Sequence, residues 1–300
     1  MPLDPQIASL VEASNAAAAE APPIAEQTVG MRREGYLALA AVGGSGPELD
    51  RVDDLSIAGV PCRLYANHDP HGVFLFIHGG GYTIGDLETH DQICRQLTLE
   101  SGATLIAVDY RLAPEHPFPA GIDDAWAVFQ AVHDDRASYG GGTKIVVGGD
   151  SAGGNFSAVL ALMARDAGLD LAAQLLVYPA VDVNDDSPSM TENGAGYILS
   201  TETMNWFNAQ YKPDPLDWRA SPLLADSHAD LAPAVVITAE FDPLRDQGAK
   251  YAQTLQAAGV AVTHTNYDGM VHAFFQISEL TDAGKRAATQ IALAAKDALA

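Results

Sequence analysis

Hydrophobic residues along this chain fall into two recurring patterns. Short runs of β-branched and aliphatic residues, typical of buried strands, alternate with longer segments in which apolar residues recur three and four positions apart, as on helices. The short runs predict strands at residues 52–57, 60–65, 73–77, 105–108, 145–147, 175–178, 234–238 and 262–267. The longer segments predict helices at residues 28–42, 86–101, 121–133, 152–165, 201–211 and 247–258.

The order of these elements predicts the fold class. The first three strands are joined by short turns, so we expect an antiparallel start to a sheet. From residue 105 onward strands alternate with helices, which predicts right-handed crossovers and a mostly parallel central sheet with helices on both faces. The chain of 300 residues is therefore expected to form one α/β domain over residues 46–300.

Two segments fall outside this alternation. Residues 1–45 predict two helices, because Asp4-Pro5 can open the first and Pro22-Pro23 ends it before the helix at 28–42. A second segment, about 182–220, interrupts the alternation at the carboxyl end of the sheet, where substrate pockets form. We interpret both as candidate lids, and a terminal arm and ordinary helix packing are the alternatives.

Composition and charge narrow the class of protein. Hydrophobic residues make up 48% of the chain, yet no apolar run approaches the roughly 18 residues of a membrane span, so a soluble globular protein is expected. The net charge of −23 opposes binding to nucleic acid and to anionic membrane surfaces. Asp4 and Glu12 precede any basic residue, unlike a signal peptide, so we expect a cytoplasmic location. Cys62 and Cys94 form no CxxC pattern and are expected to be reduced and buried.

The first candidate for chemistry is Ser151. It lies between the strand at 145–147 and the helix at 152–165, in the sequence Gly149-Asp150-Ser151-Ala152-Gly153. Glycines two residues on either side allow a tight turn that holds the serine hydroxyl clear of the backbone. Ser151 is therefore the candidate nucleophile, and a glycine-rich turn without chemistry is the alternative.

A second candidate feature is the run His78-Gly79-Gly80-Gly81-Tyr82, which follows a predicted buried strand. Three successive glycines are costly in backbone entropy, so something must approach the main chain closely there. Bare backbone amides could donate hydrogen bonds to an oxyanion, which an acyl-transfer site requires. A flexible loop and a phosphate cradle are the alternatives, although the GK[ST] of a P-loop is missing.

Candidate partners for Ser151 follow the last two predicted strands. Asp242 and His272 lie at the same edge of the sheet as Ser151, in the chain order Ser, Asp, His. Glu240 and Asp246 are rival acids, and His264 is a rival histidine within a strand. His68 and His71 lie in a polar turn without a third nitrogen or sulfur ligand, so no metal site is expected.

Together these motifs closely resemble the bacterial hormone-sensitive-lipase-like esterases (family IV carboxylesterases), which have the α/β-hydrolase fold, and the match covers nearly the whole chain. The motifs are His78-Gly79-Gly80-Gly81, Asp109-Tyr110-Arg111-Leu112-Ala113-Pro114-Glu115-His116, Gly149-Asp150-Ser151-Ala152-Gly153-Gly154, Asp242-Pro243-Leu244-Arg245-Asp246 and His272-Ala273-Phe274. One departure is Gln247, where many relatives carry an acid.

The resemblance implies a set of roles. Ser151 would be the nucleophile, His272 the base and Asp242 the group that orients it. The amides of three residues would form the oxyanion hole: Gly80, Gly81 and Ala152. Residues 1–45 and 182–220 would form a helical cap, in which Phe207, together with Tyr82, is expected to contact the substrate.

The resemblance also implies a reaction. Members of the family hydrolyse small esters of short or medium acyl chains through an acyl-enzyme, without a cofactor or a metal. An amidase, a lactonase and a deacetylase would use the same residues, so these substrates stay open. A non-catalytic binding protein is a further alternative, because some plant hormone receptors resemble the family but lack the histidine, which is present here as His272. The oligomeric state, a homodimer included, is also open.

Overall fold

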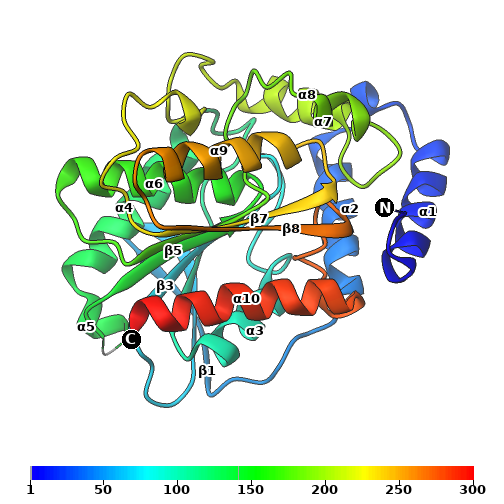
Figure 1. Ribbon diagram of the computed structural model, residues 1–300. Coiled ribbons are helices and arrows are strands. Elements are labelled where there is room, and N and C mark those ends of the chain that lie inside the picture. Colours follow the sequence, from blue (N-terminus) through cyan, green and yellow to red (C-terminus); the bar gives the residue numbers. More distant parts are fainter. Residues whose placement is uncertain (1, 141) are drawn as a thin grey trace.

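The structure is a computed structural model that describes residues 2–140 and 142–300, and a single sheet runs through its centre (Figure 1). Its strands are β1 (Arg51–Ile57), β2 (Val60–Ala66), β3 (Val73–Ile77), β4 (Thr104–Val108), β5 (Ile145–Asp150), β6 (Ala173–Val177), β7 (Ala234–Phe241) and β8 (Val262–Val271). The spatial order is β1-β2-β4-β3-β5-β6-β7-β8. β2 pairs antiparallel with β1 and β4, and the other neighbours pair in parallel. The predicted α/β class is confirmed, and β1 and β2 form the expected antiparallel start. The third strand was wrongly placed in that start, because β3 does not pair with β2 but lies between β4 and β5, parallel to both.

Helices cover both faces of the sheet. On one face lie α3 (Asp91–Ser101) and α10 (Asp282–Leu299), and on the other lie α4 (Ala120–Asp134), α6 (Ala152–Ala167) and α9 (Arg245–Ala257) (Figure 1). Every residue of β3, β4, β5 and β6 is buried, which explains why these strands are mostly apolar without alternation. Their polar residues, which are buried as well, are Thr104, Asp150 and Gln174. The described chain also contains the short helix α5 (Arg136–Gly140).

The remaining helices gather beyond the carboxyl ends of the parallel strands (Figure 1). They are α1 (Pro5–Glu20), η1 (Ile24–Glu26), α2 (Val29–Val42), α7 (Pro188–Glu192) and α8 (Thr201–Tyr211); η2 (Pro222–Leu224) and η3 (Ser278–Leu280) are single turns. Asp4 caps α1 as its position before Pro5 predicts, and its backbone N–H donates to Gly269 O at 3.1 Å. The Asn15 amide donates to Gly196 O at 2.9 Å, so the first helix contacts the segment that interrupts the alternation.

The helix expected from residue 86 begins five residues later, at Asp91. Thr89 N–H donates to Asp86 Oδ1 at 2.8 Å, and Asp86 N–H donates to Thr89 Oγ1 at 2.9 Å. This reciprocal pair closes a turn ahead of the helix, as Asp and Thr side chains commonly do. His90 therefore stands at the end of a turn and not inside a helix.

The last two strands are longer than the sequence predicts. β7 and β8 extend beyond the predicted 234–238 and 262–267, to Phe241 and Val271, so Asp242 and His272 directly follow strand ends. The C-terminal helix α10 adds to the elements that the pattern predicted, and buried alanines form its inner face. Cys62 and Cys94 are buried free thiols, as expected.

Candidate active site

Ser151 lies at the turn between β5 and α6. Its backbone has φ 55° and ψ −116°, a conformation that non-glycine residues rarely adopt. The Ser151 N–H donates to Val177 O at 2.9 Å, and Ser151 O accepts from Asn155 N–H at 3.0 Å, so both neighbours fix the strained residue. Such strain is typical of residues that a fold holds in place for function.

The glycines on either side of Ser151 are required by the backbone of β3. A Cβ on Gly149 would lie 2.1 Å from Ile77 O, and a Cβ on Gly153 would lie 1.9 Å from the same oxygen. The turn therefore packs directly against the strand that leads into the glycine run, and any side chain would force the two apart.

His272 connects Ser151 to Asp242. His272 Nε2 lies 3.0 Å from Ser151 Oγ, and its Nδ1 lies 2.7 Å from Asp242 Oδ2. Asp242 is fully buried, and its other oxygen accepts from Leu244 N–H at 2.8 Å. With the carboxylate as acceptor, Nδ1 carries the proton and Nε2 faces the serine as an acceptor, the arrangement of a nucleophile, a base and an orienting acid.

The rival residues make other contacts. Glu240 Oε2 accepts from Gly269 N–H at 2.7 Å. Asp246 pairs with Arg245 Nε at 2.8 Å and accepts from Ser189 N–H at 2.9 Å. His264 Nε2 lies 3.0 Å from Thr238 Oγ1, which fits a structural role in the sheet. The structure brings none of them to Ser151.

The glycine run after β3 forms a tight loop beside Ser151. Gly80 and Gly81 have φ values of 118° and 56°, and Gly80 O accepts from Ile84 N–H at 2.9 Å. Both glycines line the same cavity as Ser151 and Ala152. The three residues whose amides are candidates for the oxyanion hole therefore line one cavity of the structure.

A buried polar cluster behind this loop was not anticipated from the sequence. Asp150 Oδ1 accepts from Gly79 N–H at 2.9 Å and lies 3.2 Å from His90 Nε2. Burial by itself would raise the pKa of Asp150, but the interaction with His90 and the bond from Gly79 outweigh it, and the net pKa is lowered. His78 stacks on Tyr110 with ring centroids 4.4 Å apart, and its Nδ1 donates to Gly79 O at 2.7 Å. Asp150 therefore links the serine turn to the glycine loop.

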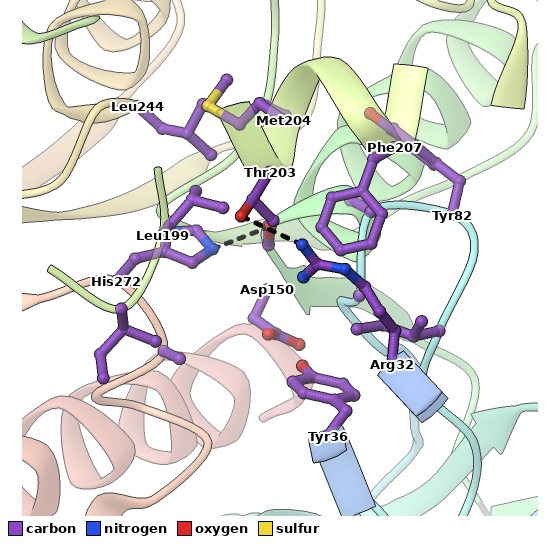
Figure 2. Close-up of a pocket in the computed structure, with 18 of the residues that line it drawn as sticks. Arg32, Tyr36, Tyr82, Asp150, Leu199, Thr203, Met204, Phe207, Leu244 and His272 are labelled. Atoms are coloured by element: carbon purple, nitrogen blue, oxygen red, sulfur yellow. Dashed lines mark hydrogen bonds between the residues drawn. The ribbon is translucent and has the colours of Figure 1, made fainter. Parts of the chain in front are cut away.

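The cavity above Ser151 has a volume of about 740 Å³, within the usual range for small-molecule sites. Figure 2 shows Tyr82 and Phe207 on one side of it and His272 on the other. Phe207 lies against the glycine loop, because a Cβ on Gly81 would come within 2.3 Å of its ring. Tyr82 stacks on Tyr211 at 4.0 Å between centroids, which joins the loop to α8.

Helix α2 supplies lining residues that the sequence reasoning missed, among them Tyr36 and Arg32. Tyr36 points toward Asp150 in Figure 2, and its ring lies 6.0 Å from that of His90. Burial, together with the negative charge of Asp150, raises the pKa of its phenol. Arg32 reaches toward Thr203 of α8 (Figure 2). The only signal in the sequence was that α2 belongs to a candidate lid.

Metal or membrane features are not found in the described part of the chain. Across residues 2–140 and 142–300, no three His, Cys, Asp or Glu side chains are grouped as metal ligands. No helix in the same residues is both long and apolar enough to cross a membrane.

A mostly parallel sheet with a serine turn after β5, an acid after β7 and a histidine after β8 defines an α/β hydrolase. A family model described as the alpha/beta hydrolase fold matches residues 74–276. Carboxylesterase NlhH of Mycobacterium tuberculosis is 42% identical over 84% of this chain and 84% of its own length. The ethyl acetate hydrolase of Pseudomonas putida is 36% identical over 94% of this chain and 95% of its own length.

Solved structures agree with these relatives. The hyperthermophilic esterase of the archaeon Pyrobaculum calidifontis is 38% identical with a TM-score of 0.92, and the match covers 100% of both chains. An α/β hydrolase from the metagenome of Lake Arreo is 37% identical with a TM-score of 0.93, over 98% of each chain. The chain belongs to the hormone-sensitive-lipase-like carboxylesterases of the α/β-hydrolase fold.

Proposed function

We propose that this carboxylic ester hydrolase is a serine esterase in which Ser151, His272 and Asp242 act as the triad. His272 takes the proton of Ser151 Oγ as the oxygen attacks the ester carbonyl, and it returns that proton to the leaving alcohol. A water then attacks the acyl-enzyme with His272 again as the base. The observation that carries the proposal is the chain of contacts from Ser151 Oγ through His272 to Asp242, at 3.0 and 2.7 Å.

The proposal assigns the oxyanion hole to the backbone N–H groups of Gly80, Gly81 and Ala152. Donors fixed before the reaction stabilise the tetrahedral oxyanion strongly, because they need no reorganisation as charge develops. The bond from Gly79 N–H to Asp150 supports this assignment, since it fixes the loop next to the donors. Tyr82 and Phe207 are proposed to contact the substrate above these donors.

The proposed substrates are small esters of short to medium acyl chains. Residues 1–45 and about 182–220 are proposed to act as a cap over the site, and the ring of Phe207 against Gly81 supports a limited pocket. Each buried methylene contributes about 0.8 kcal/mol until the pocket is full. Amides, lactones and acetylated compounds remain alternative substrates of the same residues. A cytoplasmic location and a homodimer are also kept as proposals, the location because both thiols are free.

A chain-length series of 4-nitrophenyl esters tests the proposal. We expect kcat/KM to rise with acyl length to a short or medium optimum and then fall, and Ser151→Ala to remove most turnover while the protein stays folded. Ser157→Ala is the matched control, because that serine lies on α6 and its hydroxyl donates to Gly153 O at 2.8 Å, away from the cavity lining. Stoichiometric labelling by an organophosphate of any serine other than Ser151 would contradict the assignment. Better turnover of long-chain triglyceride emulsions than of butyrates would contradict the substrate class.

A further inference from the structure

Arg32 places a cation in the cavity of a protein whose net charge is −23. The residue lies on α2 and lines the cavity together with Ser151 and His272. Figure 2 shows its guanidinium extending from α2 into the pocket, toward Thr203. A charged group in this position faces whatever substrate the pocket holds.

The contacts of Arg32 fix its guanidinium but leave most donors unused. Its Cζ lies 4.9 Å from the ring centroid of Trp206 and 5.7 Å from that of Phe207. Nη2 donates to Thr203 Oγ1 at 3.4 Å, and Nε is buried without a hydrogen-bond partner. A guanidinium has five N–H donors, so a planar acceptor can still bind to it.

No carboxylate neutralises Arg32. Over the described residues 2–140 and 142–300, it forms no ion pair with an Asp or Glu, whereas its neighbour Arg33 forms two bonds of 2.8 Å to Glu115. Burial lowers the pKa of Arg32, and the negative charge of Glu202 only partly offsets this. The guanidinium stays charged throughout the accessible pH range, so its lost hydration is incompletely replaced within the chain.

We propose that Arg32 binds a carboxylate on the substrate, so that the preferred esters carry an anionic group in the part of the molecule that lies against α2 and α8. This inference rests on the proposed esterase function of the same cavity. A single guanidinium fork matches a carboxylate in geometry and charge. A phosphate dianion brings a second negative charge that no other cation in the cavity lining offsets.

Acidic residues elsewhere in the cavity determine how an anionic substrate is oriented in it. Asp182 and Asp185 follow β6 and lie next to Gln247, which accepts from Asp182 N–H at 3.0 Å and donates to Asp185 Oδ2 at 3.2 Å. Two carboxylates there disfavour a negative group by like-charge repulsion. The third carboxylate of the cavity lining, Asp150, lies on the side of α2, but it accepts from Gly79 N–H at 2.9 Å and faces His90 Nε2 at 3.2 Å. The charged end of the substrate therefore faces Arg32, and the uncharged end faces the loop after β6.

Two matched substrate pairs test the inference. Mono-4-nitrophenyl adipate against 4-nitrophenyl hexanoate places a carboxylate on the acyl side, and 3-acetoxybenzoate against phenyl acetate places one on the alcohol side. We expect Arg32→Gln to lower the anionic-to-neutral ratio of kcat/KM by about 10- to 100-fold in at least one pair, because bonds to charged groups contribute that much. The loss should lie mainly in KM, and added salt should produce a smaller change of the same sign.

Three further variants distinguish carboxylate binding by Arg32 from a structural role of this residue. Arg32→Lys keeps the charge but loses the fork, so its ratio should lie between those of the wild type and Arg32→Gln. Arg33→Gln removes an equal charge one residue away and should leave the ratio unchanged. Glu202→Gln removes the nearby anion and should raise the ratio.

The two hypotheses fail in different ways. An unchanged ratio in both pairs for Arg32→Gln, while Ser151 still supports turnover of the neutral esters, overturns the carboxylate site alone. Turnover of the neutral esters that survives Ser151→Ala overturns the proposed function instead. An equal loss on anionic and neutral esters in Arg32→Gln assigns Arg32 to packing and also overturns the carboxylate site.

Discussion

Acidification should destabilise this protein through His78, which is buried behind the glycine loop and stacked on Tyr110. Burial, and next the interaction with His90, lower the pKa of His78 to about 4; the Gly79 carbonyl and the carboxylate of Asp150 offset only part of this. The unfolded chain takes up a proton near pH 6.5 while folded His78 stays neutral. The stability that the protein owes to a neutral His78 is therefore fully present above about pH 6.5 and is lost as pH falls toward 4.

The size of this loss follows from the gap between the two pKa values. His78 moves from 6.5 to about 4, a gap of about 2.5 pH units. One unit corresponds to about 1.4 kcal/mol, so at about pH 4.5, where most of the gap has been crossed, His78 costs about 2–3 kcal/mol of unfolding free energy. This is a large fraction of the 5–15 kcal/mol that is typical of folded domains.

Urea unfolding at about pH 7 and about pH 4.5 measures the effect. His78→Asn keeps a donor for Gly79 O but cannot titrate, so between the two pH values it should lose about 2–3 kcal/mol less stability than the wild type. Tyr110→Phe is the matched control, because it removes the hydroxyl bond to His78 O at 3.0 Å without removing the histidine. It should cost about 1 kcal/mol at both pH values. Equal pH dependence in the wild type and His78→Asn would refute the reasoning.

Three further predictions concern catalysis. Gly80→Ala places a Cβ 2.1 Å from Ile84 O at a φ of 118°, so the loop must move and kcat should fall by about 100-fold or more; a kcat within threefold of wild type would remove Gly80 from the oxyanion hole. The kcat/KM of a neutral ester should fall on acidification, because His272 accepts a proton only as a neutral imidazole; a kcat/KM that does not change on acidification would exclude it as the base. Asp150→Asn removes the charge that faces His90 and should lower kcat by up to about 100-fold with little change in KM; a loss confined to KM would contradict a positioning role.

Much of the fold could be predicted because buried parallel strands leave a direct record in the sequence. The apolar run at residues 145–147 of β5 reflects burial between neighbouring strands, and the glycines around Ser151 reflect the close approach of the β3 backbone. Each is visible as a local pattern in the sequence. Asp242 and His272 could be picked out because parallel strands bring their carboxyl ends to one edge. Their contacts with Ser151 then depend on side-chain geometry that only the structure gives.

Other parts of the site left no local pattern. His90 falls within a stretch whose acids suggested the first turn of a helix, and only the Asp86–Thr89 turn reveals that it faces Asp150. Arg32 meets Thr203 across 171 positions of sequence, so its place in the cavity depends on how α2 packs against α8. Long-range packing of this kind is set by tertiary contacts that residue periodicity does not encode.

The cavity is lined partly by residues at the edge of the sheet and partly by helices outside it, and this affects how substrate selectivity can evolve. Ser151, Asp242 and His272 follow strands of the sheet, but much of the cavity lining comes from α2 and from the segment around α8. Within the described residues, neither segment contributes a strand to the sheet. Mutations in those two segments can reshape selectivity while the sheet that holds Ser151 and His272 keeps its packing. The range of substrates can therefore change without loss of the reaction. For laboratory evolution toward new esters, residues 27–42 and 198–208 are the positions to randomise.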